Sequence, residues 1–156
     1  MRSIGAGNTN VVLELRSQMA TTQEIMAAAD NMRVLLVEDS AVLAERISEL
    51  IDPIVDIDLV GVVDSESEAV AAVRRGSVDV VILDLHLKQG TGFGVMRAIA
   101  TLPRKPRIVV LTNYDLPEYE SAAMGLGASY FLDKARDYGR LPQVLTELNQ
   151  STRDAN

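Results

Sequence analysis

The feature that most constrains this chain is a short, mainly apolar run that ends on a carboxylate, at Val78–Asp84. Short apolar runs of this kind are typical of strands that are buried on both faces of a parallel sheet. In an open α/β sheet, ligands bind outside the carboxyl ends of the strands. The run therefore predicts a buried strand that places Asp84 at the mouth of such a site.

Two other apolar runs also end on polar side chains. Val34–Val37 is followed by Glu38 and Asp39, and Ile108–Leu111 is followed by Thr112. Because the carboxyl ends of parallel strands meet at one edge of a sheet, these side chains are expected to lie beside Asp84. The sequence thus predicts three carboxylates and a hydroxyl at a single edge.

Strand patterns and helix patterns alternate along the rest of the chain. The predicted strands are 33–38, 57–63, 78–83, 107–111 and 129–132. Helices are expected near 40–52, 65–76, 93–101, 117–125 and 141–150, with Met96, Ile99 and Ala100 on the core side of the third. This alternation predicts an α/β fold with a doubly wound, five-stranded parallel (βα)5 sheet in the order 2-1-3-4-5. The point where the strand order reverses then lies beside Asp39 and Asp84.

Composition excludes several functions. The 156 residues include 22 acidic and 15 basic side chains, giving a net charge of −7, which argues against direct nucleic-acid binding through a basic surface. There is no cysteine, which excludes disulfides, thiolate catalysis and cysteine zinc sites and is compatible with the cytoplasmic location that we expect. No apolar run approaches the roughly 20 residues of a membrane span, so no membrane insertion is expected.

The two ends of the chain differ from its centre. Residues 3–10 are rich in glycine, asparagine and threonine and are expected to be flexible. The next apolar residues fall roughly on one helical face: Val11, Leu15, Met19 and Met26. This segment is either a docking helix or a frayed extension. We therefore expect an N-terminal extension at 1–31, one domain at 32–150 and a disordered tail at 151–156.

The predicted constellation suits phosphoryl chemistry. Carboxylates that lie this close repel one another, so they need a cation, and Mg²⁺ prefers oxygen ligands. Lys134 follows the fifth strand and can supply a fixed positive charge, while Thr112 can donate a hydroxyl proton. A carboxylate surrounded by such groups can attack phosphorus and form an acyl phosphate. Each residue alone also has an ordinary interpretation, as a helix cap or a solvated surface lysine, so only their conjunction is informative.

From Met32 to about Gln150 the chain resembles the receiver domain of two-component response regulators. The motifs that carry the resemblance are Val37-Glu38-Asp39-Ser40, Leu83-Asp84-Leu85, the Gly90–Gly92 loop, Leu111-Thr112, Gly127-Ala128 and Lys134. The resemblance implies a flavodoxin-like fold. It also implies a phosphorylation switch that is not an enzyme, apart from catalysing its own phosphorylation and dephosphorylation.

The resemblance assigns a role to each site residue. Asp84 is the implied phosphoacceptor, and Thr112 and Lys134 are implied to bind the phosphoryl oxygens. The implied Mg²⁺ ligands are Glu38, Asp39, Asp84 and the backbone carbonyl of His86. Tyr130 is implied to be a switching aromatic that turns inward when Thr112 moves.

The resemblance also implies partners. The phosphoryl group is expected to come from a histidine kinase or a histidine phosphotransfer protein. A homodimer or an effector is expected to use the face made by the helix at 117–125, the fifth strand and the last helix. No output domain follows the last helix in this sequence, so action through a binding partner or a phosphorelay is expected.

Three departures from the family pattern carry predictions. Ala135 stands where the family usually has a proline, often after a cis bond, and a non-proline cis bond costs roughly 3 kcal/mol, so this loop is expected to be trans or strained. Asn113 follows Thr112 and is expected to narrow access to the site. The bulky side chains of His86 and Tyr114 lie where the family tunes hydrolysis of the acyl phosphate, which predicts a long-lived phosphoryl state.

Three alternative functions compete with a phosphorylation switch. A haloacid-dehalogenase-type phosphatase needs a second carboxylate two residues after the nucleophile, where this chain has His86. A flavin-binding protein needs a phosphate loop after the first strand, where Glu38 and Asp39 would repel a phosphate. The remaining alternative is a degenerate receiver that acts as a scaffold independently of phosphorylation, and the complete set of site residues argues against it.

Overall fold

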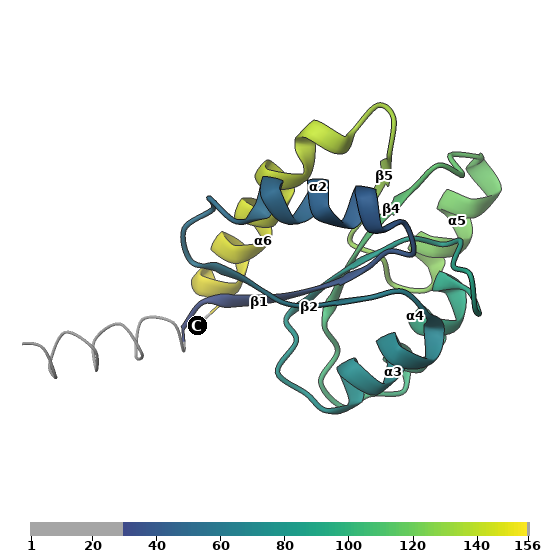
Figure 1. Cartoon of the computed structure of the whole chain (residues 1–156). Coiled ribbons are helices and arrows are strands. Elements are labelled where there is room, and N and C mark those ends of the chain that lie inside the picture. The colour runs from purple at the N-terminus through teal and green to yellow at the C-terminus, as the bar shows by residue number, and fades with distance from the viewer. Residues whose placement is uncertain (1–29, 156) are drawn as a thin grey trace, which may run out of the picture. The chain divides into compact units, whose positions relative to one another are not determined.

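The computed structural model describes residues 30–155, and the chain divides into two units at residues 31 and 32 (Figure 1). The predicted N-terminal extension lies, but for its last two residues, outside the described residues. The second unit contains one parallel sheet in the order β2-β1-β3-β4-β5, which confirms the predicted topology. Its strands are β1 (Met32–Val37), β2 (Ile57–Val63), β3 (Val80–Leu83), β4 (Arg107–Thr112) and β5 (Tyr130–Asp133).

Helices cover both faces of this sheet (Figure 1). One face carries α2 (Ala41–Ile51) and α6 (Leu141–Asp154), and α6 follows a short 3-10 turn, η1 (Tyr138–Arg140). The opposite face carries α3 (Glu66–Arg74), α4 (Gly92–Ala100) and α5 (Pro117–Gly125). Within residues 30–155, no helix combines the length and the apolar character that a membrane crossing needs.

The core lies in two layers because successive strand side chains point to opposite faces of a sheet. In β1, Val34 and Leu36 pack under α2 and α6, whereas Leu35 and Val37 pack under the other three helices. All four residues of β3 are buried. This complete burial explains why the sequence of β3 shows no alternation of polar and apolar residues.

Side-chain caps fix where three helices begin, all at the edge of the sheet that carries the site. Ser40 Oγ accepts a hydrogen bond from the Leu43 amide, and Ser65 Oγ accepts one from the Glu68 amide. Both caps agree with the sequence pattern. Thr91 Oγ1 caps α4 in the same way. Such caps satisfy backbone donors that a helix otherwise leaves without partners.

Helix α4 begins one residue earlier than predicted, at Gly92. A Cβ at this position would overlap the backbone carbonyl of Asp84, so only glycine allows this approach. The prediction that Ala100 faces the core is wrong, because Ala100 is exposed and Val95 is buried instead. The close contact at Gly92 sets the rotation of the helix and brings Val95 inward.

Helix α6 continues through Asp154, so the prediction of disorder from residue 151 is wrong for residues 151–154. The guanidinium of Arg153 lies 3.1 Å from the carboxylate of Asp56 in the loop before β2. The side-chain amide of Asn149 donates a hydrogen bond to the backbone carbonyl of Asp56. These long-range contacts stabilise a helix end that its local polarity disfavours.

Candidate functional site

The ammonium of Lys134 joins the carboxyl ends of three strands. Its Nζ lies 2.6 Å from Asp84 Oδ2, after β3, and 2.7 Å from Glu38 Oε2, after β1. Lys134 itself follows β5, at the far edge of the sheet. All three side chains are at least nine-tenths buried, so these ion pairs are shielded from water. The structure therefore brings together three of the residues that the sequence predicted for the site.

Backbone amides hold the other oxygens of the two carboxylates. Glu38 Oε1 accepts a hydrogen bond from the Ser40 amide at 3.0 Å, and Asp84 Oδ1 accepts one from the His86 amide at 3.2 Å. Each carboxylate is thus fixed by one backbone donor and by the shared ammonium. The chain turn after each strand orients the side chain that precedes it.

Three carboxylates at this edge fit a divalent cation. Ligand oxygens of Glu38, Asp39 and Asp84 all lie within 4.8 Å of one another. Three carboxylates and the single ammonium of Lys134 leave two negative charges, which one divalent ion would neutralise. Hard cations such as Mg²⁺ prefer this all-oxygen donor set. Receiver domains typically bind Mg²⁺ at such acidic residues, whereas the role of the His86 carbonyl stays a prediction.

Burial and pairing shift two proton affinities in the site. Burial raises the pKa of the Glu38 carboxyl above its ordinary value, against the lowering effect of the hydrogen bond from Lys134. Burial also works to lower the pKa of Lys134, but its hydrogen bonds to Asp84 and Glu38 outweigh this effect and raise that pKa. Lys134 is therefore a fixed cation at neutral pH.

Thr112 ends β4 between Asp84 and Lys134 in the strand order. It is fully buried, and its Oγ1 accepts a hydrogen bond from the Tyr114 amide at 3.3 Å. Its carbonyl accepts a hydrogen bond from the Lys134 amide at 2.9 Å. The hydroxyl keeps its proton free to donate, and the backbone of Lys134 is tied to the same strand end.

A cavity of about 310 Å³ opens over the carboxylates. Its lining includes Asp84 and Lys134 together with His86, Asn113 and Tyr114, the residues that the sequence singled out as obstacles. The rings of His86 and Tyr114 lie with their centroids 5.5 Å apart. This aromatic pair forms one wall of the cavity, and its effect on access to Asp84 stays a prediction.

The aromatic contacts continue away from the site. Tyr114 contacts Tyr119 of α5 at 5.8 Å between ring centroids, and Tyr119 stacks on Phe93 of α4 at 6.2 Å. These rings, with His86, line a neighbouring cavity of about 360 Å³. A row of rings thus runs from the mouth of the acidic cavity across α5 to α4, which the sequence pattern did not predict.

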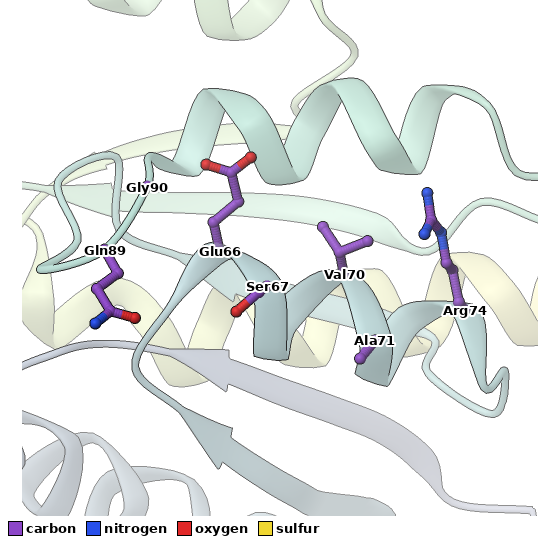
Figure 2. Close-up of a pocket in the computed structure, with 7 residues that line it drawn as sticks. All are labelled: Glu66, Ser67, Val70, Ala71, Arg74, Gln89 and Gly90. Atoms are coloured by element: carbon purple, nitrogen blue, oxygen red, sulfur yellow. The ribbon is translucent and has the colours of Figure 1, made fainter.

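Glu66 holds the loop that follows Asp84. It points from the first turn of α3 toward Gly90, at one end of a cavity of about 500 Å³ (Figure 2). Its carboxylate accepts a hydrogen bond from the Thr91 amide at 2.8 Å. A side chain at Gly90 would overlap Glu66, and Gly90 also has a φ of +78°. This glycine therefore allows the loop to close against α3.

Tyr130 lies on the wrong face of the sheet for the predicted role. Its ring packs on the α6 side, and its hydroxyl donates to Glu147 Oε2 at 2.9 Å. Thr112 shares the opposite face with Val110, because strand side chains alternate. The structure does not bring Tyr130 and Thr112 together. Phe131 packs on the same face of the sheet as Thr112. Thr112 pairs with Asp133 in the strand register, and Phe131 lies two residues before Asp133, so their side chains share one face.

The comparisons agree with this geometry. The family model of the response regulator receiver domain matches residues 34–146. Transcriptional regulatory protein CitB of Klebsiella pneumoniae is 30% identical over 116 residues, which are 74% of this chain and 50% of that protein. Sensory transduction protein LytT of Bacillus anthracis is 25% identical over 114 residues, which are 73% of this chain and 46% of that protein. The chain spans about half the length of these relatives.

Solved structures show the same fold. A LuxR-family two-component response regulator from Aurantimonas sp. SI85-9A1 has a TM-score of 0.72 and 25% identity, covering 78% of this chain and 86% of that chain. The response regulatory domain of mrkE from Klebsiella pneumoniae has a TM-score of 0.72 and 24% identity, and the match covers 79% of this chain and 99% of that chain. The acidic edge, the sheet order and the family match agree, and the chain belongs to the response regulator receiver domain family.

Proposed function

We propose that this protein is a signalling switch in which Asp84 accepts a phosphoryl group. The observation that carries the proposal is the buried ammonium of Lys134, which lies within 2.7 Å of both Asp84 and Glu38. A structural ion pair needs one carboxylate, whereas this site gathers three carboxylates and one cation around a cavity. Such a site suits transfer of a dianionic group.

The transfer is a displacement at phosphorus. An Asp84 carboxylate oxygen attacks the phosphorus of a phosphohistidine, the new P–O bond forms as the P–N bond breaks, and the leaving imidazole takes up a proton. Lys134 and the Thr112 hydroxyl stabilise charge on the phosphoryl oxygens. Glu38, Asp39, Asp84 and the His86 carbonyl would hold Mg²⁺, which would supply further charge neutralisation. Water then attacks phosphorus, the P–O bond to Asp84 breaks, and the Asp84 carboxylate and inorganic phosphate are released, so the proposed chemistry acts on the protein itself.

The expected donor is a histidine kinase or a histidine phosphotransfer protein, because receiver domains interact with such proteins. One relative, protein-glutamate methylesterase/protein-glutamine glutaminase 5 of Myxococcus xanthus, is named for an enzymatic activity, and this chain covers 32% of its length. Binding partners, a cytoplasmic location and the absence of direct nucleic-acid contact stay predictions for this chain.

The output is proposed to start at Thr112. When the phosphoryl group recruits the Thr112 hydroxyl, the Tyr114 amide loses its acceptor, and Tyr114 contacts Tyr119 of α5. Helix α5 is weakly held, since Ala123 is its only buried residue and its first turn has no side-chain cap. A shift of Tyr114 can therefore move α5 at a small free-energy cost.

The output surface is the exposed side of α5 together with β5 and α6. Leu116 is 53% exposed and Met124 is 46% exposed, so apolar area is available there for a partner or a second copy. In one solved structure with the same fold, two RcsB dimers are bound to two parallel DNAs. For this chain, sedimentation with and without the phosphoryl group separates two outcomes. A mass that doubles on phosphorylation indicates a homodimer, and an unchanged mass leaves the surface to an effector.

The first experiment is intact-mass measurement after incubation with Mg²⁺ and phosphoramidate, with Asp84→Ala in parallel. One added phosphoryl group on the wild type alone supports the proposal. Beryllofluoride binding separates the remaining cases, because Asn113 at the cavity mouth can block small donors. A wild type that neither gains mass nor binds beryllofluoride contradicts the proposal and favours the scaffold.

A further inference from the structure

The turn that follows β5 is closed by a buried carboxylate that lies outside the phosphoryl site. Asp133 is 8% exposed. Its Oδ1 accepts hydrogen bonds from two consecutive amides, those of Ala135 at 2.9 Å and Arg136 at 2.8 Å. A carboxylate that accepts two backbone donors forms strong, charge-assisted hydrogen bonds. Asp133 therefore fixes the path of the chain on the far side of Lys134.

A second carboxylate closes the same turn from its other end. Asp137 Oδ2 accepts a hydrogen bond from the Asp133 amide at 3.0 Å, and the Asp137 amide donates to the Asp133 carbonyl at 2.8 Å. The hydrogen bond from the Asp133 amide also lowers the pKa of Asp137. Four hydrogen bonds thus enclose residues 133–137, and both backbone groups of Asp133 take part.

Lys134 lies inside this closed turn. Its amide donates to the Thr112 carbonyl on one side, and the amide of the next residue, Ala135, donates to Asp133 on the other. The peptide bond between Lys134 and Ala135 is trans. A proline at position 135 would have no N–H to donate, so this hydrogen bond exists because the chain carries alanine there.

The position of the Lys134 ammonium depends on this backbone. Its Nζ lies within 2.7 Å of two buried carboxylates from different strands, and such contacts tolerate little displacement. The Lys134 side chain is more than nine-tenths buried, so its stem has little room to compensate for a shift of its Cα. The hydrogen bonds of the Asp133 carboxylate go to the amides of Ala135 and Arg136, so its effect on the site runs through the backbone that carries Lys134.

We propose that Asp133 is a positioning residue that sets the ammonium of Lys134 against Asp84, in the place of a proline after the lysine. This proposal rests on the proposed phosphoryl transfer to Asp84. The amide oxygen of asparagine can accept the same two backbone hydrogen bonds, whereas alanine can accept none. The comparison of Asp133→Ala with Asp133→Asn therefore isolates the hydrogen bonds from the charge.

The test measures phosphorylation by phosphoramidate and the fluorine NMR spectrum of bound beryllofluoride. Asp133→Ala is expected to lower the phosphorylation rate about ten-fold, since small displacements in an active site are costly, and to shift the fluorine signals that report contact with Lys134. Asp133→Asn is expected to restore the rate to within about three-fold of the wild type. The exposed Asp52, at the C-terminal end of α2 and away from the site, provides the matched control Asp52→Ala, which is expected to change neither readout.

The results separate this proposal from the proposed function. A wild type without adduct or beryllofluoride binding contradicts the proposed function. A competent wild type with an unchanged Asp133→Ala variant overturns the positioning role alone, as does an equal loss in Asp133→Ala and Asp133→Asn. If circular dichroism finds Asp133→Ala unfolded, Asp133→Val, which has nearly the shape of aspartate but no hydrogen-bond acceptor, takes its place, and a rate equal to that of the wild type overturns the proposal.

Discussion

Lys134 Nζ lies 2.6 Å from Asp84 Oδ2, and both side chains are more than nine-tenths buried. The same ammonium lies 2.7 Å from Glu38, so a single cation balances two carboxylates that end different strands. One side chain therefore contributes both to the stability of the sheet edge and to the proposed chemistry.

Lys134→Met is expected to lower the free energy of unfolding by about 3 kcal/mol in the presence of a chelator, because two buried carboxylates lose their counter-charge. Asp84→Asn is the control, since it leaves Lys134 paired with Glu38 and is expected to cost less. Urea unfolding followed by circular dichroism measures both variants. Equal stability of Lys134→Met and the wild type would contradict the assignment of this ion pair.

Asp39→Asn is expected to weaken Mg²⁺ binding at least about ten-fold, because it removes one carboxylate from an all-oxygen donor set. Asp52→Asn, a change at an exposed carboxylate at the C-terminal end of α2, away from the site, is expected to leave the affinity unchanged. Isothermal titration calorimetry gives both values. If the two variants bind Mg²⁺ equally, Asp39 is no ligand.

Tyr130→Phe is expected to remove one tyrosine ionisation with a raised pKa from an alkaline titration. The hydrogen bond to Glu147 raises the pKa of Tyr130 above the ordinary value of 10.0. Since only the protonated phenol donates, this stabilisation is complete below about pH 10 and is lost as the pH rises through the raised value. Tyrosinate absorbance follows the titration, and phosphorylation of the variant is expected to stay normal. A slower phosphorylation would restore a role for Tyr130 in the switch.

Replacing His86 and Tyr114 together by alanine is expected to shorten the lifetime of the phosphoryl group, because their rings form one wall of the cavity over Asp84. Phe93→Ala, at the far end of the row of rings, is the control and is expected to change the lifetime little. Release of labelled phosphate after removal of the donor measures each rate. Loss of label from the wild type within seconds would argue against this wall as a barrier to water.

Much of the fold follows from local patterns in the sequence. The strand order, the caps at Ser40 and Ser65 and the edge occupied by Asp84 are set by apolar runs, turn chemistry and the geometry of parallel strands. The position of Lys134 after the fifth strand and the family motif together predict that it lies at the site. Its double ion pair depends on packing that no sequence pattern records.

The errors share a cause, which is a contact between segments far apart in the chain. The rotation of α4 follows from the approach of Gly92 to the carbonyl of Asp84, and the end of α6 follows from the pairing of Arg153 with Asp56. The face of Tyr130 follows from the register between β4 and β5. None of these relations has a local signature, so periodicity misplaced Ala100, polarity misled about the last residues, and the resemblance misassigned Tyr130.

The row of rings beside the site has a practical consequence for spectroscopy. The chain contains four tyrosines and no tryptophan, so tyrosine emission is not masked. Two of the four, Tyr114 and Tyr119, lie in ring contact at the mouth of the acidic cavity and on α5. Any rearrangement that separates them changes the surroundings of half of the intrinsic fluorophores. The protein thus carries an unlabelled optical reporter of its own site.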